Sequence, residues 1–256
     1  MNVIAVIGTS GGAGVTTVAA QLAAGLVAQR RHAIAFDLSP DNALRLHFGM
    51  DWEDETGLAP MVASGKPWNE AAFCSASGVD FIPFGKPDDE RTIADFAHSL
   101  AAQPAWLASR LAELDMPAET YVICDCPRTE GALRSQALAA ARLTLIVVTP
   151  DALSYAAART TAEAALAQGA RRVAFVLNGF DPARALDQDV ATLMRTDFFS
   201  SLVPVVLHRD ESLREALASK QSVFEYAPSS RATYDFSALA MWVVAHLSHR
   251  HEKKAA

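Results

Sequence analysis

Lysine is scarce in this chain of 256 residues and missing from its N-terminal part. Only five of the 22 Lys and Arg residues are lysines, the first of them is Lys66, and the formal net charge is −7. Nucleic acids and anionic membranes attract clustered cations, which an acidic chain with few lysines supplies poorly. The composition therefore predicts no nucleic-acid partner.

Long hydrophobic runs and cysteines are also few. No stretch reaches the roughly 18 apolar residues of a membrane-spanning helix, so direct membrane insertion is not predicted. The N-terminus lacks the basic segment of a secretory signal. An odd, small number of cysteines, three, fits a reducing compartment. Cys124 and Cys126 flank Asp125 without a second pair to complete a metal site, so we interpret them as small buried hydrophobes. These absences predict a cytoplasmic protein.

Apolar runs alternate with segments of helical periodicity along the chain. This pattern is typical of a doubly wound, mainly parallel sheet flanked by helices, the α/β class. We expect a single domain over residues 1–248, followed by a polar, disordered tail at 249–256. Helices are predicted at 16–29, 152–168 and 234–246, and strands at 3–7, 33–38, 79–83, 121–125, 143–149, 172–178 and 202–207.

The most informative motif is a glycine-rich loop, GTSGGAGVTT, at residues 8–17 between the first strand and the first helix. Glycines let backbone N–H groups approach phosphate oxygens, and the following helix directs its positive end at the same anion. Thr16 stands where a hydroxyl would ligate Mg²⁺. The bland interpretation is a strand-to-helix turn without a ligand. The strand–loop–helix context favours a phosphate loop.

This loop departs from the Walker A pattern G-x-x-x-x-G-K-[ST]. With Gly14 as the second glycine, Thr9 occupies the first glycine position and Val15 the lysine position. The pattern alone would therefore miss the loop.

Residues 10–17 resemble the deviant Walker A loop, K-G-G-x-G-K-T-T, of the MinD/ParA family of P-loop NTPases. The segments 36–40, 123–127 and 176–178 resemble that family's switch I, its switch II with the Walker B strand, and its adenine-reading strand. The resemblance implies ATP and Mg²⁺ as cofactors, with Mg²⁺ held by Thr16 and, through water, by Asp125. It implies nucleotide contacts from Gly11, Gly12, Ala13, Gly14, Val15, Thr16, Thr17, Asp37, Asp125, Arg128 and Asn178. Without the resemblance, Asn178 would equally suit a turn.

Longer strings resemble a narrower group, the BcsQ family of cellulose-biosynthesis proteins. They lie at residues 39–46, 81–85, 125–128, 207–211 and 218–221. The resemblance implies a cytosolic accessory subunit of a bacterial cellulose synthase and secretion system. Its partners would be a small BcsR-like subunit and a BcsE-like sensor of cyclic di-GMP. Through them the chain would reach the inner-membrane synthase indirectly, as a peripheral component.

Three charged residues of the MinD/ParA pattern are replaced. Ser10 stands at the lysine that crosses the dimer, Val15 at the Walker lysine, and Ser39 at the carboxylate that orients the attacking water. Each lost charge-assisted contact costs roughly 1.5–3 kcal/mol, and each lost electrostatic stabiliser slows phosphoryl transfer by about 10²–10³. We therefore expect an ATP-binding, dimerising regulatory subunit with weak or absent hydrolysis.

The homodimer would form through the nucleotide face, and it needs another cation near the phosphates. Arg128, directly after the Asp-x-Pro motif, is the leading candidate, with Arg209 and Lys220 as further ones. The main alternative is an active MinD/ParA-like ATPase switch that governs localisation or partitioning. A scaffold that has lost nucleotide and a DNA-partitioning protein are weaker alternatives.

Overall fold

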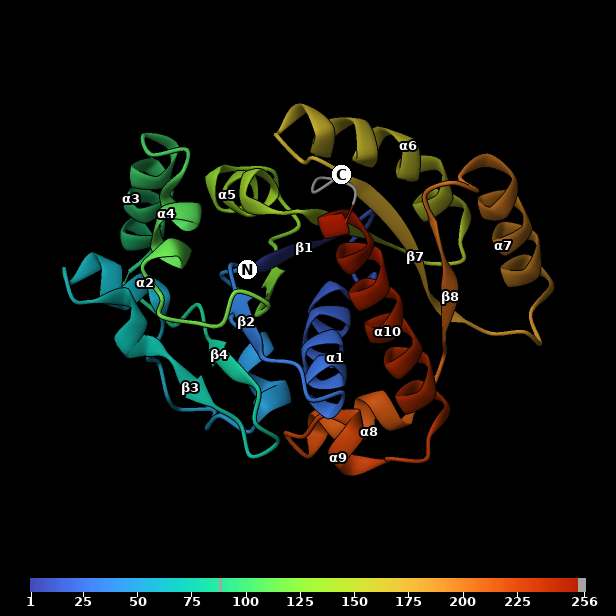
Figure 1. Ribbon diagram of the computed structural model, residues 1–256, viewed down its shortest axis with the longest axis horizontal. Coiled ribbons are helices and arrows are strands. Elements are labelled where there is room, and N and C mark those ends of the chain that lie inside the picture. Colours follow the sequence, from blue (N-terminus) through green and yellow to red (C-terminus); the bar gives the residue numbers. More distant parts are fainter. Residues whose placement is uncertain (88, 253–256) are drawn as a thin grey trace.

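The computed structural model describes residues 1–87 and 89–252. Their strands form one eight-stranded sheet in the order β3-β4-β2-β5-β1-β6-β7-β8 (Figure 1). All neighbouring strands pair in parallel except β3 and β4. The strands are β1 (Asn2–Gly8), β2 (Ala33–Asp37), β3 (Phe73–Cys74), β4 (Asp80–Ile82), β5 (Tyr121–Asp125), β6 (Leu143–Val148), β7 (Val173–Phe180) and β8 (Leu202–His208).

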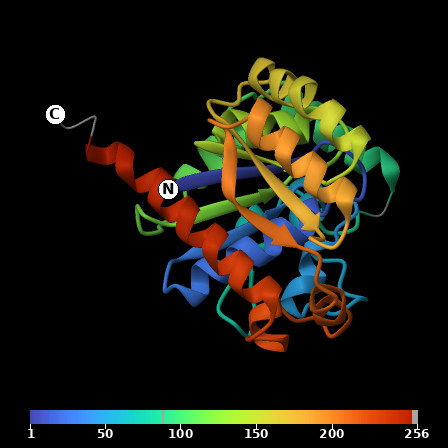
Figure 2. The same cartoon turned by 90° about the vertical axis from the view of Figure 1, so that its right-hand side faces the viewer.

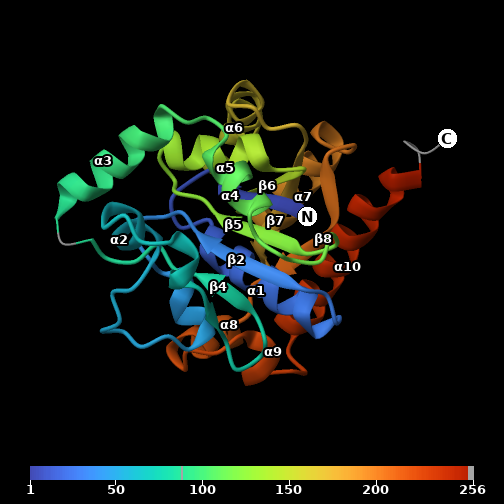
Figure 3. The ribbon, with the colours of Figure 1, turned by 60° about the vertical axis from the view of Figure 1, so that its left-hand side comes forward.

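Helices cover both faces of this sheet, and a separate hydrophobic core lies between the sheet and the helices on each face. Helix α1 packs side by side with α10 on one face, as Figures 1 and 2 show. Helices α3, α5, α6 and α7 lie on the other face, where Figure 3 shows α3 at the periphery. The helices are α1 (Val15–Ala28), α2 (Leu58–Ala63), α3 (Glu90–Ala101), α4 (Trp106–Ala112), α5 (Ala132–Ala140), α6 (Ala152–Ala167), α7 (Ala185–Asp197), α8 (Ser212–Ala218), α9 (Val223–Tyr226) and α10 (Arg231–Glu252), with 3-10 turns at Leu44–Phe48 and Trp68–Ala71.

The central strands are almost entirely apolar because both of their faces are covered. Every residue of β5 (YVICD) and of β6 (LTLIVV) is buried. The predicted α/β class is thereby confirmed. The short antiparallel edge strand β3 was not predicted.

The C-terminal helix is longer than its apolar pattern indicates. It was expected at 234–246 but begins at Arg231 and runs to Glu252, so residues 249–252 of the predicted disordered tail are helical. Adding a residue to an existing helix costs little, which lets the backbone pattern continue past the packed part. Residues 253–256 of that tail lie outside the described residues. None of the helices described here is long and apolar enough to cross a membrane.

Candidate nucleotide-binding site

The glycine-rich loop joins β1, at the centre of the sheet, to α1. Ligands of open α/β sheets bind at the carboxyl ends of the strands, where this loop lies. Gly12 and Gly14 have φ of 78° and 90°, in the left-handed region that favours glycine. At Gly14 a β-carbon would also lie 2.5 Å from Asn178 Nδ2, so any side chain there would displace the Asn178 amide. The loop therefore needs glycine for its shape.

The first turn of α1 faces this loop without a competing cap. Gly14 occupies the N-cap position, no side chain caps the helix, and its first turn holds no acidic residue. The first N–H groups of a helix lack intrahelical partners and carry a partial positive charge. Together with the backbone of the loop, they form a cradle for an anionic group.

A cavity of about 420 Å³ opens over the loop. Its walls come from the loop, from the start of α1, and from the segments that follow β2 and β5. The lining residues are Gly8, Ser10, Gly11, Gly12, Ala13, Gly14, Val15, Thr16, Thr17, Ser39, Asp41, Cys126 and Arg128. The structure thus brings most of the predicted loop, switch I and switch II residues together around one space.

Asp125 ends β5 behind this cavity and is 1% exposed. Neither of its carboxylate oxygens has a hydrogen-bond partner among the described residues. Burial raises its pKa to about 7, the nearby Thr16 side chain acts to lower the pKa, and the charge of Asp41 raises it. A buried carboxylate without a partner is costly, and a cation supplies what it lacks. Thr16 and Asp125 thus fit a nucleotide-bound Mg²⁺.

Asp37, by contrast, has both oxygens engaged in shaping switch I. It accepts hydrogen bonds from the backbone N–H of Ser39 at 2.9 Å and of Leu44 at 3.1 Å. Burial, followed by the charge of Asp125, raises the pKa of Asp37 well above its ordinary value. Asp37 therefore braces the turn that carries Ser39, which is 7% exposed and lines the cavity.

Val15 does not take over any part of the lysine's role. Its side chain lies against Gly8, where a β-carbon would be 2.8 Å from Val15 Cγ2, and it packs partly on the hydrophobic core. An aliphatic group in this place offers a phosphate neither charge nor a hydrogen bond.

Arg128 is the cation that lies at the loop. A β-carbon on Gly11 would lie 2.9 Å from Arg128 Nη1, so the guanidinium covers this glycine. The other two cations predicted for this role do not line the cavity. Lys220 pairs with Asp51 at 3.5 Å, and Arg209 is exposed after β8 with its N–H bonded to Phe180.

Asn178 lies within β7 rather than in a turn, which excludes the turn interpretation. Its Nδ2 donates a hydrogen bond to the Ala13 carbonyl at 2.7 Å. The residue is thus placed beside the phosphate loop. Its contact with adenine stays a prediction.

Three further polar contacts of this region were not predicted. Thr9 Oγ1 donates to the Val147 carbonyl at 3.2 Å and also bonds the Ser154 hydroxyl at the start of α6. Asp151 caps α6 by accepting from Ser154 N at 2.9 Å. The sequence signal was an Asp three residues before Ser154 at the start of a helical pattern, which predicts the cap but not its contact with the loop.

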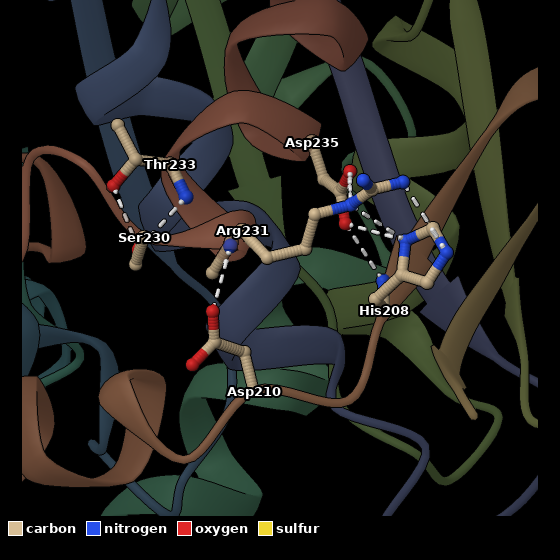
Figure 4. Close-up of polar contacts among 7 residues, drawn as sticks. His208, Asp210, Ser230, Arg231, Thr233 and Asp235 are labelled. Carbon is tan, nitrogen blue, oxygen red and sulfur yellow. Dashed lines mark hydrogen bonds and ion pairs between the residues drawn. The ribbon is translucent and has the colours of Figure 1, made fainter. Parts of the chain in front are cut away.

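The chain after β8 holds a polar cluster that joins this strand to α10 (Figure 4). Asp235 Oδ2 lies 2.9 Å from both the N–H and Nδ1 of His208, and its Oδ1 accepts from Arg231 Nε at 3.1 Å. Asp210 accepts from Ala232 N at 2.9 Å, in the first turn of the helix. The string 207–211, singled out in the sequence, therefore anchors the last helix.

Comparison with known proteins decides the family. The family model described as "Cellulose biosynthesis protein BcsQ" matches residues 1–244. The chain belongs to this family. The Cellulose biosynthesis protein BcsQ of Escherichia coli K12 is 28% identical over 249 residues, which cover 97% of this chain and 96% of the relative. An uncharacterized protein of Pseudomonas putida is 25% identical over 253 residues, covering 93% of each chain.

Solved structures place this BcsQ-family chain in the MinD/ParA-like fold. The septum site-determining protein MinD from Pyrococcus horikoshii, complexed with Mg-ADP, superposes with a TM-score of 0.75 at 21% identity, covering 93% of this chain and 94% of that one. The ATP complex of a McdA variant from Cyanothece gives a TM-score of 0.75 at 17% identity, covering 96% of each chain. The predicted fold and family are both confirmed, and fold neighbours hold Mg²⁺ with a nucleotide.

Proposed function

We propose that this chain is an ATP-binding, dimerising regulatory subunit of a bacterial cellulose synthase and secretion system, with weak or absent hydrolysis. One observation carries the proposal. The cavity over the loop keeps its backbone cradle, and the unpartnered Asp125 lies buried at the end of β5 behind it, while Val15 and Ser39 stand where charged groups serve phosphoryl transfer. The site thus keeps the groups that would bind a nucleotide and lacks charged groups that would speed its hydrolysis.

Nucleotide binding is supported by groups that need no lysine. The backbone N–H groups of residues 11–14 and the open end of α1 would contact phosphate oxygens. Thr16 would ligate Mg²⁺, and Asp125 would hold one of its waters, which gives the buried carboxylate its missing partners. The Mg²⁺ would neutralise part of the phosphate charge. Asn178 would present its amide to adenine from the end of β7, and Asp37 would keep switch I in shape.

Weak turnover is supported by the lack of charged side chains at positions 15 and 39. Phosphoryl transfer depends on positioning and on neutralising charge at the transferred group. The Val15 side chain lies against Gly8, and the Ser39 hydroxyl is not a carboxylate. Losing one such stabiliser typically costs about 10²–10³ in rate, and combined losses do not simply multiply.

Dimerisation through the nucleotide face is supported by the position of Arg128. A two-fold interface presents the same surface from both subunits, so two loops and their phosphates would face each other. The guanidinium over Gly11 supplies a cation there, in place of the lysine that Ser10 replaces. A small BcsR-like subunit and a BcsE-like sensor of cyclic di-GMP would bind the dimer. They would link it, as a cytoplasmic protein, to the membrane-bound synthase.

A second candidate is an active ATPase switch of the MinD/ParA type. Arg128 in the cavity favours this candidate, because an arginine near the transferred phosphoryl group stabilises the negative charge of the transition state. Phosphate release separates the two. Sustained turnover of about 1 s⁻¹ or faster would establish the switch and refute the regulatory subunit with weak hydrolysis.

Thermal unfolding tests the binding itself. At about 100 times the Kd, a ligand that binds only the folded state stabilises it by about 2.7 kcal/mol. Millimolar Mg·ATP should therefore raise the Tm of the full chain, and Mg²⁺ without nucleotide serves as the control. An unchanged Tm would refute nucleotide binding, and the chain would then be interpreted as a scaffold without nucleotide.

A further inference from the structure

A carboxylate that the switch I pattern does not include lies at the phosphate-loop cavity. Asp41 is exposed in the turn after β2 and lines this cavity together with Thr16 and Arg128. Its charge is close enough to act on both Asp37 and Asp125. The residue therefore faces the same space as Thr16, the predicted Mg²⁺ ligand.

The turn holds Asp41 in this place. The Ser39 hydroxyl donates to Asp41 Oδ2 at 3.4 Å, and Asp41 N donates back to Ser39 Oγ at 3.4 Å. Next along the chain, Asn42 has φ of 50° and accepts a hydrogen bond from Gly85 N at 3.1 Å. Serine at position 39 thus holds a carboxylate two residues further on instead of supplying one.

Among the described residues, no ion pair neutralises the three acids Asp37, Asp41 and Asp125. Asp125 is buried with both oxygens unpartnered. No three His, Cys, Asp or Glu side chains of the described chain are close enough to ligate one metal directly. These carboxylates therefore do not form a complete set of direct ligands by themselves, which suits a cation that keeps some of its waters.

We propose that Asp41 is a positioning residue for the nucleotide-bound Mg²⁺ and would accept hydrogen bonds from waters on the metal. Mg²⁺ keeps several of its waters when it binds to proteins and phosphates, so carboxylates often hold it indirectly. Such outer partners typically contribute about 10–100-fold to metal affinity. This inference rests on the proposed nucleotide binding.

The test titrates Mn²⁺, which is paramagnetic and replaces Mg²⁺, into the full chain with saturating ADP, followed by electron paramagnetic resonance. Asp41→Asn should weaken Mn²⁺ binding about 10–100-fold. Asp41→Glu, which keeps the carboxylate, should recover part of the affinity. Glu53→Gln is the matched control, because Glu53 is a nearby acid that does not line this cavity. In EDTA, Asp41→Asn should bind ADP as well as wild type or better, because it removes a negative charge near phosphate.

The outcomes separate this inference from the proposed function. If wild type binds Mn²⁺ with ADP and Asp41→Asn binds the metal equally well, Asp41 has no role at the metal and the nucleotide site stands. An equal loss in Glu53→Gln would reduce the effect to general surface charge and overturn the inference. If wild type itself takes up neither ADP nor Mn²⁺, the proposed nucleotide binding is refuted, and the inference with it.

Discussion

The side-chain amide of Asn178 donates a hydrogen bond to the carbonyl of Ala13 across 2.7 Å, and so joins the end of β7 to the phosphate loop. The two residues are 165 positions apart in the chain. The contact fixes the loop before any ligand arrives. It also leaves the side-chain carbonyl of Asn178 to accept from a base.

Asn178→Ala should therefore affect both the loop and the base preference. Loss of the bond should lower the free energy of unfolding by about 0.5–1.5 kcal/mol. The preference for ATP over GTP should fall as well, because the side-chain carbonyl would accept from the amino group of adenine. Chemical denaturation and competitive binding of the two nucleotides measure these effects, with exposed Asn69→Ala as control. An unchanged preference would limit Asn178 to supporting the loop.

Val15→Lys should raise affinity for Mg·ATP more than it raises turnover. A charge-assisted contact to phosphate contributes roughly 1.5–3 kcal/mol, or about tenfold and more in Kd. Ser39 would still lack a carboxylate, so phosphate release should stay slow. Calorimetry and a phosphate-release assay measure the two quantities, and Val15→Met controls for length without charge. Turnover that rises as much as affinity would show that the lysine alone limited catalysis.

Stability without ligand should fall as pH rises toward neutrality. Burial raises the pKa of Asp125 to about 7, so between about pH 4 and 7 the folded chain binds more protons than the unfolded chain. Protonated Asp125 tolerates burial, and this advantage is lost as pH rises through about 7. The free energy of unfolding should decrease by up to about 1.4 kcal/mol per pH unit in this window.

Asp125→Asn provides the comparison, because its amide does not titrate. Its unfolding free energy should exceed that of wild type at pH 8 and approach it near pH 4, as measured by urea denaturation across the range. Parallel pH profiles for the two proteins would show that Asp125 does not carry the effect.

Arg128→Ala should weaken dimerisation in ATP while leaving the monomer folded. The guanidinium over Gly11 is the cation that would meet phosphate charge across the interface. Light scattering of wild type and variant, each with ATP or ADP, measures the effect, and Arg195→Ala, which does not line the cavity, is the control. A variant that dimerises as well as wild type would transfer this role to another residue.

The order of apolar runs and helices sufficed to predict the α/β class, because a parallel strand that is buried on both faces consists of consecutive apolar residues. The two-residue strand β3 escaped prediction, since Phe73 and Cys74 alone form no periodic pattern. The glycine-rich loop could be located because its glycines are adjacent in the sequence, whereas the roles of its residues were implied by the resemblance and stay a prediction. Contacts such as Thr9 with Ser154 and Arg128 with Gly11 depend on which strands become neighbours. Local sequence does not encode this directly.

The Thr9–Ser154 contact also couples the position of the glycine-rich loop to that of α6. The helix has 16 residues and is therefore about 24 Å long. Any displacement of the loop that preserves this hydrogen bond must carry the first turn of α6 with it. A tilt of roughly 5° at that end moves the far end, at Ala167, by about 2 Å. A small shift of the loop would thereby be enlarged at the far end of α6, on a surface remote from the loop.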